Sequence, residues 1–385
     1  MKYFTLTIFL ISINYLQADC SDLDYADCLY WSEYCEWNED SNECQEIGGG
    51  DGGGGTDWGP YEYLTLTESD GLRDGPDYNY AVLYYPVADS TTDLNLPYKS
   101  IIMSPGWSDD GSGMDYWGEF FASYGFVSMI IGPNDPINDD HQDRGLGLVD
   151  AMETIRQEND RTSSPLFGLV DLEAFAVGGQ SMGGGAAQAA AMLDPSIKAI
   201  ISLNPTFFVY DTENCDGPEY YCLIPEHLNH PVPALIFPGE IEIDEMGAEY
   251  NCCLGQTIYD YIPETTEKIL FEVSGEGHDA AAYPSEEIAD YILNWLNYQL
   301  NNDNSYCESL LELPSNASQY LTNIICTSFD FYDINGDGGT NNSDFTHLLV
   351  SLLNQTPLEL SGDLNFDSSV DIYDLLILSD YLDNM

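Results

Sequence analysis

The sequence predicts an α/β protein with a mostly parallel central sheet that is covered by helices on both faces. Short apolar runs alternate with longer amphipathic stretches between about residues 61 and 300, and this alternation is typical of parallel strands joined by helices. A chain of 385 residues with 44% apolar residues also provides enough material for a large core and small appendages. In such sheets the active site lies at the carboxyl ends of the strands, so the residues that follow each strand are the first candidates for function.

The main domain is expected to cover residues 58–305. Apolar runs predict strands at residues 80–85, 100–104, 127–131, 174–178, 199–203, 234–238 and 269–273. Between them, helical periodicity marks residues 116–124, 146–157, 184–193 and 286–300.

The charge of the chain limits its partners. Its 67 Asp and Glu residues against 8 Lys and Arg give a formal net charge of −59. This charge repels phosphate backbones and anionic membrane surfaces, which excludes nucleic-acid binding and docking through basic patches. The carboxylate excess is tolerable only when it is screened or neutralised, which favours surroundings rich in salt or divalent cations.

The first 18 residues have the features of a secretory signal peptide. Lys2 precedes an apolar stretch from Phe4 to Ile13, and Ala18 offers a small residue for cleavage. This stretch is too short to span a bilayer and no later run approaches twenty apolar residues, so we expect a secreted, extracellular protein without a membrane span. Export makes disulfides permissible for the ten cysteines.

Residues 19–46 form a small Cys-rich module. This stretch is too short to bury a core, so its cysteines predict a knot of two disulfides. Zinc binding is the alternative, but the segment has no His and no CxxC pair. The cysteines are Cys20, Cys28, Cys35 and Cys44. A Gly-rich linker at residues 47–57 separates this module from the main domain.

The segment around Ser181 predicts a nucleophile. A predicted strand is followed by the Gly-x-Ser-x-Gly pattern of residues 179–183 and then by an Ala-rich helix. The flanking glycines allow a sharp strand-to-helix turn on which the serine projects above the sheet. The backbone amide of Met182 then points to the same spot. The Ser104-Pro105-Gly106-Trp107 turn can bring the amide of Trp107 there too, so these two amides predict an oxyanion hole.

A serine nucleophile needs a base and an orienting acid, expected in the chain order serine, acid, histidine. Of the five histidines, His278 lies just past the last predicted strand and before the last helix, so it is the predicted base. The acid should follow the strand at residues 234–238. That loop offers Glu240, Glu242 and Asp244, and the residues alone do not choose among them.

Residues of about 70–300 resemble the secreted polyesterase-type cutinases, which include the PET hydrolases, in the dienelactone-hydrolase-like branch of the α/β-hydrolases. The resemblance runs in order through Tyr84-Tyr85-Pro86, Ser104-Pro105-Gly106-Trp107, Trp117-Gly118, residues 123–127, residues 179–185, residues 233–237 and Gly277-His278. It implies an α/β-hydrolase fold and a carboxylic ester hydrolase acting on esters or polyesters through a Ser-His-Glu/Asp triad, without a catalytic cofactor. We expect the catalytic domain to be monomeric.

The resemblance also assigns further roles. The acid position, nine residues after Pro233, is Glu242, where the family usually has Asp, and Asp244 is the runner-up. Phe207 stands near the position of the family's substrate-stacking aromatic residue, so Trp107, Met182 and Phe207 are the expected substrate contacts. A terminal disulfide is implied for Cys307 and Cys326 in a connector at residues 306–330. The pairing of the remaining four stays open: Cys215, Cys222, Cys252 and Cys253.

The last segment, residues 331–385, contains an internal duplication. Two loops thirty residues apart carry oxygen-bearing residues at positions 1, 3, 5, 9 and 12 and a backbone carbonyl at position 7, which is the spacing that wraps a calcium ion. The expected ligands of two structural Ca²⁺ ions are Asp333, Asn335, Asp337, Gly339, Asn341 and Asp344 in the first loop and Asp363, Asn365, Asp367, Ser369, Asp371 and Asp374 in the second. Asp at position 12 and the lack of an incoming helix resemble a dockerin, which implies a cohesin-like scaffold or surface protein as partner.

The leading hypothesis is therefore a secreted serine esterase of the cutinase or polyesterase type. A dockerin-like tail makes a carbohydrate esterase, acting on acetyl or feruloyl groups within a polysaccharide-degrading complex, an alternative. A catalytically inactive, calcium-dependent binding module is a third hypothesis from a different class.

Overall fold

The computed structural model describes residues 35–38, 43–46, 58–87, 95–210, 215, 221–326, 332, 334–335, 340–354, 362–365 and 369–383. The chain divides into two units, residues 1–57 and residues 58–385. In the first unit, β1 (Cys35–Asn38) and β2 (Glu43–Glu46) pair as an antiparallel hairpin. The predicted signal peptide, the Gly-rich linker, Cys20 and Cys28 lie outside the described residues, whereas Cys35 lies on β1 and Cys44 on β2.

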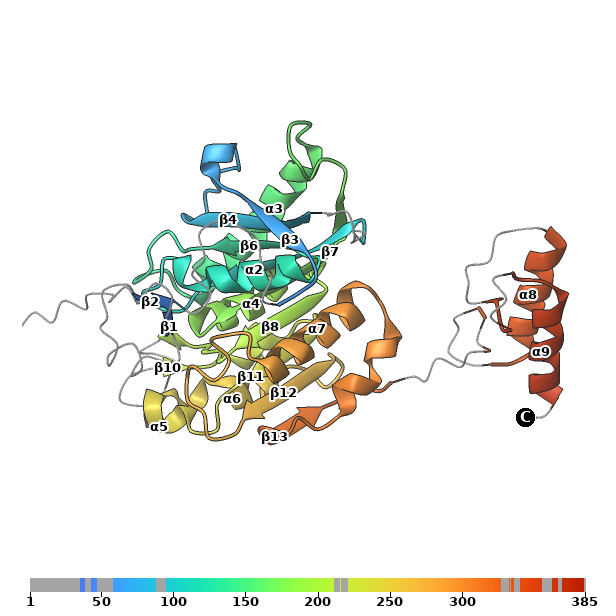
Figure 1. Ribbon diagram of the computed structural model, residues 1–385. Coiled ribbons are helices and arrows are strands. Elements are labelled where there is room, and N and C mark those ends of the chain that lie inside the picture. Colours follow the sequence, from blue (N-terminus) through green and yellow to red (C-terminus); the bar gives the residue numbers. More distant parts are fainter. Residues whose placement is uncertain are drawn as a thin grey trace, which may run out of the picture. The chain divides into compact units, whose positions relative to one another are not determined.

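The main domain is built on one sheet of nine strands (Figure 1). The strands are β3 (Glu62–Leu66), β4 (Ala81–Val87), β5 (Tyr98–Ser104), β6 (Val127–Ile131), β7 (Val170–Gln180), β8 (Ala199–Leu203), β11 (Ala234–Phe237), β12 (Lys268–Val273) and β13 (Ala317–Thr322). Their order is β13-β12-β11-β8-β7-β5-β6-β4-β3. The pairs from β6 to β12 are parallel, whereas β3–β4, β4–β6 and β12–β13 are antiparallel. The α/β prediction is confirmed, with a mixed sheet whose centre is parallel.

Strands β3 and β13 were not predicted. The position of β13 also corrects the predicted end of the main domain at residue 305. This strand lies within residues 306–330, the predicted connector, yet it pairs antiparallel with β12 at the edge of the sheet. The sheet therefore extends past the predicted domain end at residue 305. Cys307 and Cys326 form the disulfide that the resemblance implied, and it closes the segment that carries β13.

Helices cover both faces of the sheet (Figure 1). One hydrophobic cluster includes buried residues of α2 (Asp115–Ser123) and α7 (Glu286–Leu300). The other includes those of α3 (His141–Asp160), α4 (Met182–Leu193) and α6 (Gly255–Tyr261). The short helix α5 (Glu242–Met246) follows β11, and β9 (Val209–Tyr210) pairs with β10 (Tyr221–Cys222). Turns of 3₁₀ helix cover Glu68–Asp70, Ser112–Met114, Pro225–Leu228, Ala248–Cys252, Asn304–Tyr306 and Glu308–Leu311.

Helix α3 begins earlier than the expected residue 146 because Asp140 caps it. The Asp140 carboxylate accepts hydrogen bonds from the backbone N–H groups of Gln142 and Asp143, at 2.8 and 3.1 Å. The Asp143 carboxylate in turn accepts from the Asp140 N–H, which completes a reciprocal capping box. The extra first turn brings His141 and Arg144 into the helix.

The C-terminal segment contains α8 (Asn342–Asn354) and α9 (Ile372–Asp383), which lie side by side (Figure 1). Their core consists of Ile334, Leu348, Leu364, Leu375 and Leu378. Ile334 and Leu364, like Leu348 and Leu378, stand thirty residues apart, so the duplication in the sequence is also a duplication in the core. Among the described residues, no helix is both long and apolar enough to cross a membrane.

Candidate active site

Ser181 occupies a sharp turn between β7 and α4. Its backbone has φ 55° and ψ −117°, a conformation that residues with a side chain rarely adopt. The two flanking glycines are required by close packing. A Cβ atom on Gly179 would come within 2.3 Å of the Ser104 carbonyl oxygen, and one on Gly183 within 1.9 Å of the same atom. The glycines of the motif thus let the turn approach the loop that follows β5.

His278 links Ser181 to an acidic side chain. Its Nε2 lies 2.8 Å from Ser181 Oγ, and its Nδ1 lies 2.5 Å from Glu242 Oε1. Ser181 is 9% exposed and Glu242 only 2%, so the acid is more shielded from solvent than the serine. With the proton on Nδ1, the ring donates to Glu242 and accepts from the Ser181 hydroxyl.

The three candidate carboxylates, Glu240, Glu242 and Asp244, make different contacts. Glu242 lies against the imidazole, whereas Asp244 is exposed. Glu240 accepts from the Ser274 hydroxyl at 3.1 Å and from the Gly275 N–H at 2.7 Å. The three candidates therefore differ in position, and Glu242 is the one that contacts the ring.

A fourth acidic residue of this loop, Glu245, was not among the candidates. It accepts from the backbone N–H of His278 at 2.8 Å. Gly277 makes room for it, because a Cβ atom there would meet the Glu245 carboxylate at 1.8 Å. Helix α5 thus binds both the ring and the backbone of His278.

Asn204 supports the loop that carries His278 and was also missed from the sequence. It follows β8, has φ 44° and is fully buried. Its Nδ2 donates to the Gly277 carbonyl at 3.1 Å, and its Oδ1 accepts from the Ala281 N–H at 2.8 Å. Burial raises the pKa of the Glu242 carboxyl, while His278, the Gly239 N–H and the Asn204 side chain act in the opposite direction.

The two amides of the predicted oxyanion hole lie on segments that pack against each other. The amide of Met182 is the first of helix α4, so no carbonyl within the helix can accept from it. Trp107 follows Gly106, whose Cα packs so closely that a Cβ atom there would lie 3.2 Å from Ser181 Cβ. The Trp107 side chain is 58% exposed and donates from Nε1 to the Ile137 carbonyl at 3.2 Å.

Phe207 does not occupy the position expected for a substrate-stacking residue. It is 3% exposed, and its ring contacts the rings of His141 and His227 at centroid distances of 5.3 and 6.4 Å. Its N–H donates to the Cys253 carbonyl at 2.8 Å. The expected stacking role of Phe207 is therefore corrected.

Disulfides fasten the loops near Phe207. Cys215 pairs with Cys222, and Cys252 pairs with its neighbour Cys253, which answers the pairing that the sequence left open. Cys253 binds Phe207 through its carbonyl, and the N–H of the preceding Thr206 donates to the Ser181 carbonyl at 3.1 Å. Two hydrogen bonds therefore connect the vicinal disulfide to the turn that carries Ser181.

The two predicted calcium loops are described in part. Asp333, Asp337, Gly339 and Asp367 lie outside the described residues. Among the rest, no group of three or more His, Cys, Asp or Glu side chains is arranged to hold a metal ion. The position-12 residues, Asp344 and Asp374, are fully buried.

These two carboxylates close their loops in the same way. Asp344 accepts from the N–H groups of Asn335 and Asn341 at 3.0 and 2.8 Å. Asp374 accepts from the equivalent groups of Asn365 and Asp371 at 3.3 and 2.7 Å. The described part of each loop is therefore held by hydrogen bonds to its buried position-12 carboxylate.

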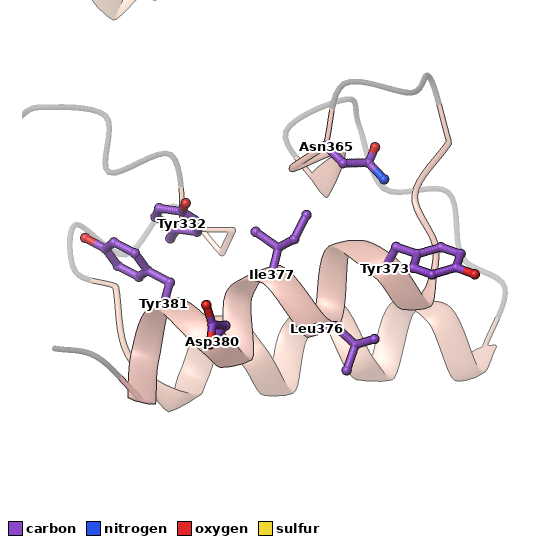
Figure 2. A pocket seen from close by; sticks show the side chains of 7 residues that line it. All are labelled: Tyr332, Asn365, Tyr373, Leu376, Ile377, Asp380 and Tyr381. Carbon is purple, nitrogen blue, oxygen red and sulfur yellow. The ribbon is translucent and has the colours of Figure 1, made fainter.

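A groove of about 590 Å³ lies on the C-terminal segment (Figure 2). It is lined by Tyr332, Asn365, Tyr373, Leu376, Ile377, Asp380 and Tyr381. The rings of Tyr332 and Tyr381 stack at one end with a centroid distance of 3.7 Å, and Tyr373 lies at the other end. Tyr373 and Leu376 are exposed.

Serine, histidine and carboxylate in this geometry at the carboxyl edge of an α/β sheet define the class of α/β-hydrolases. Residues 59–325 match the family described as "PETase: PET hydrolase-like". The chain belongs to this PET hydrolase-like family and is a carboxylic ester hydrolase.

Curated relatives agree with this assignment. Cutinase est2 of Thermobifida alba is 28% identical over 262 residues, which cover 66% of this chain and 75% of the relative. Cutinase cut1 of Thermobifida fusca is 26% identical over 262 residues, with coverage of 66% and 70%. Bis(hydroxyethyl) terephthalate hydrolase of Streptomyces coelicolor is 26% identical over 258 residues, with coverage of 66% and 73%.

Proposed function

We propose that this protein hydrolyses apolar carboxylic esters of the cutin or polyester type through a triad of Ser181, His278 and Glu242. The observation that carries the proposal is the continuous hydrogen-bonded chain from Ser181 Oγ through both imidazole nitrogens to Glu242. Asp244 is exposed and makes no such contact with the ring, which favours Glu242 as the acid.

The chemistry follows from the proton positions. Ser181 Oγ bonds to the ester carbonyl carbon while His278 Nε2 takes the hydroxyl proton, and Glu242 stabilises the imidazolium through Nδ1. Negative charge on the carbonyl oxygen is held by the amides of Trp107 and Met182. When the tetrahedral state collapses, the bond to the leaving alkoxide breaks and His278 returns the proton to it. Water then repeats these steps on the acyl-enzyme and releases the acid.

Apolar side chains around the site favour an apolar substrate. Trp107, Ile137, Ile241 and Tyr283 are exposed, and they lie on the loops after β5, β6, β11 and β12, beside the proposed catalytic groups. Tyr283 stacks on Tyr116 with a centroid distance of 4.3 Å, which fixes its ring. Exposed apolar groups gathered at a reactive centre are typical of surfaces that bind apolar chains.

Two experiments test this function. We expect Ser181→Ala to lose hydrolysis of p-nitrophenyl butyrate and labelling by a fluorophosphonate probe; full activity of the variant would contradict the triad. A panel of short-chain esters, triglyceride, acetylated xylan and polyester film then tests the substrate class. We expect Trp107→Ala to reduce release from the film more than turnover of the short ester. Preference for acetylated xylan would instead favour the carbohydrate esterase.

For residues 331–385 we propose a dockerin-like module with two Ca²⁺ ions held by the twelve loop residues named above. The matching hydrogen bonds of Asp344 and Asp374 support two equivalent sites. Its exposed Tyr373 and Leu376 offer a docking surface for a cohesin-like scaffold or surface protein. Calorimetric titration of Ca²⁺ into the chelated protein should give about two sites per chain, and the Asp344→Ala variant one fewer.

We also propose that the protein is exported, with residues 1–18 removed, residues 19–46 held by disulfides, and residues 47–57 acting as a linker. The three disulfides among the described residues are consistent with an oxidising compartment. Mass spectrometry of the secreted protein should find Asp19 at its N-terminus.

A further inference from the structure

The proposed oxyanion donor Trp107 N–H belongs to the same peptide group as the Gly106 carbonyl. A peptide group is planar, so its N–H points in a direction fixed by its C=O. Whatever holds the Gly106 oxygen therefore also sets where the Trp107 hydrogen points.

Arg144 holds that oxygen. One guanidinium nitrogen, Nη1, donates to the Gly106 and Pro105 carbonyls, both at 3.1 Å. The other, Nη2, donates to the Pro136 carbonyl at 2.9 Å, and Nε donates to Asp139 O at 3.3 Å. The planar fork thus ties the loop after β5 to the loop before α3.

Arg144 is a buried cation that hydrogen bonds to backbone carbonyls and forms no ion pair among the described residues. The side chain is 2% exposed, and among the described residues no Asp or Glu forms an ion pair with it. Four other basic residues do pair with carboxylates: Arg73, Lys99, Arg161 and Lys268. Burying a cation is costly, and burial lowers the pKa of the Arg144 guanidinium, while the carboxylates of Asp139 and Asp109 act in the opposite direction without hydrogen bonding to it. In a chain with 67 acidic residues, carboxylate partners are plentiful, so this arrangement points to a task for the charge.

We propose that Arg144 is a positioning residue of the oxyanion hole. Its guanidinium fixes the plane of the Gly106–Trp107 peptide and draws electron density toward the carbonyl, which makes the Trp107 N–H a stronger donor. This inference rests on the proposed function, in which the Trp107 and Met182 amides hold the developing oxyanion.

Other contacts keep the loop in place without Arg144. Ser108 N–H donates to the Pro136 carbonyl at 2.9 Å, and Trp107 Nε1 donates to the Ile137 carbonyl. Loss of the guanidinium should therefore change the direction and donor strength of the Trp107 N–H more than the backbone conformation of the loop.

The test compares an ester with its thionoester, in which sulfur replaces the carbonyl oxygen. Sulfur accepts hydrogen bonds weakly, so the ratio of kcat/KM for p-nitrophenyl butyrate to that for p-nitrophenyl thionobutyrate measures the oxyanion hole. The ratio does not depend on how much of the enzyme is folded. The variants are Arg144→Met and Arg144→Lys, which keeps the charge but loses the fork. Arg156→Met is the matched control, because Arg156 lies on the same helix over the Phe175 ring.

We expect Arg144→Met to lower kcat/KM for the ester about tenfold, less than the hundredfold or more that follows loss of a whole donor. The thionoester should change little, so the ratio falls; Arg144→Lys should lie between, and Arg156→Met should equal wild type. An unchanged ratio in both Arg144 variants, with wild type preferring the ester, overturns the role of Arg144 alone. A wild type without that preference overturns the oxyanion assignment itself, and this inference with it.

Discussion

The backbone N–H of His278 donates to Glu245 at 2.8 Å, while the imidazole of the same residue is held by Glu242 at 2.5 Å. Helix α5 thus supplies separate acceptors for the ring and for the main chain of the histidine. Exposed carboxylates usually contribute little to stability, but Glu245 fixes the segment from which the proposed base projects.

Removing the Glu245 acceptor should slow catalysis without unfolding the protein. We expect Glu245→Ala to lower kcat about fivefold with little change in KM, because the imidazole loses its fixed position while substrate contacts remain. Glu245→Gln keeps an acceptor oxygen and should approach wild type. Asp244→Asn is the control, because it removes the same negative charge at the neighbouring residue. An equal loss in the Asp244 and Glu245 variants would mean that only the charge of the loop matters.

Glu242 should be the acidic residue on which catalysis depends most. Glu242→Gln should lower kcat by about 10³- to 10⁴-fold, because an amide cannot stabilise the imidazolium and favours the wrong tautomer. Glu242→Asp draws the carboxylate back by about one C–C bond and should keep part of the activity. Initial rates with p-nitrophenyl butyrate measure both changes. A large loss with Asp244→Asn and none with Glu242→Gln would reassign the acid.

Two buried histidines should make the fold sensitive to acid. Burial lowers the pKa of His141 and of His230 from the ordinary 6.5 to about 4. The folded state therefore binds fewer protons than the unfolded chain between these values. The stability that the neutral rings contribute is present above pH 6.5 and is lost as the pH falls toward 4, by about 1.4 kcal/mol per pH unit for each histidine.

Urea unfolding between pH 7 and 4.5 measures this dependence. The buried Glu242 and the half-buried Asp115 and Glu119 act in the opposite sense, because partial or full burial raises the pKa values of their carboxyls. The comparison is therefore between variants: His141→Gln should show a shallower loss of stability than wild type. His347→Gln, at an exposed position of α8, should leave the slope unchanged. Identical slopes in all three proteins would argue against a contribution from His141.

The disulfide between Cys307 and Cys326 should stabilise the sheet edge. It closes a loop with a sequence separation of 19. Replacing both cysteines by serine should lower the free energy of unfolding by about 3 kcal/mol, chiefly because the unfolded chain gains freedom. The Cys215→Ser/Cys222→Ser variant, with a separation of 7, should lose slightly less. Chemical unfolding under oxidising conditions measures both, and a stability equal to wild type would contradict the prediction.

Chelation should affect the two ends of the chain differently. We expect excess EDTA to loosen residues 331–385, read as faster amide hydrogen exchange around Leu348 and Leu378, because the buried Asp344 and Asp374 would lose the proposed Ca²⁺ ions. Esterase activity should stay within about twofold, since the proposed triad uses no metal. Parallel loss of activity and exchange protection, both restored by Ca²⁺, would contradict this separation.

The sequence predicted the strands that are covered on both faces better than those at the edges. All seven expected strands are present, because their apolar runs stand out from their surroundings. Strands β3 and β13 are only partly buried and pair antiparallel at the margins, so their composition carries no comparable signal. The early start of α3 depends on the cap at Asp140, a signal that is visible in the sequence but was not used.

Sequence analysis identified the site residues whose place follows from chain order. It did not identify those whose contacts depend on the direction in which a side chain points. Ser181 and His278 follow from motif and order. Glu242 required the family resemblance, because nothing local tells which acidic residue of a loop faces a ring 36 positions away. Arg144 reaches the Gly106 carbonyl across 38 positions, and the buried Phe207 donates its N–H to the distant Cys253 carbonyl. Such contacts have no trace in local sequence.

The disulfide at the sheet edge has a mechanical consequence. If a partner pulls on the C-terminal module, the tension enters the main domain at Cys326 and passes through the sulfur atoms to Cys307, directly after the turn that follows α7. Residues 308–325 lie inside the closed loop, so β13 carries none of that pull and cannot be peeled from β12 until the bond is reduced. An enzyme tethered in flowing water would keep its sheet edge paired for as long as its surroundings stay oxidising.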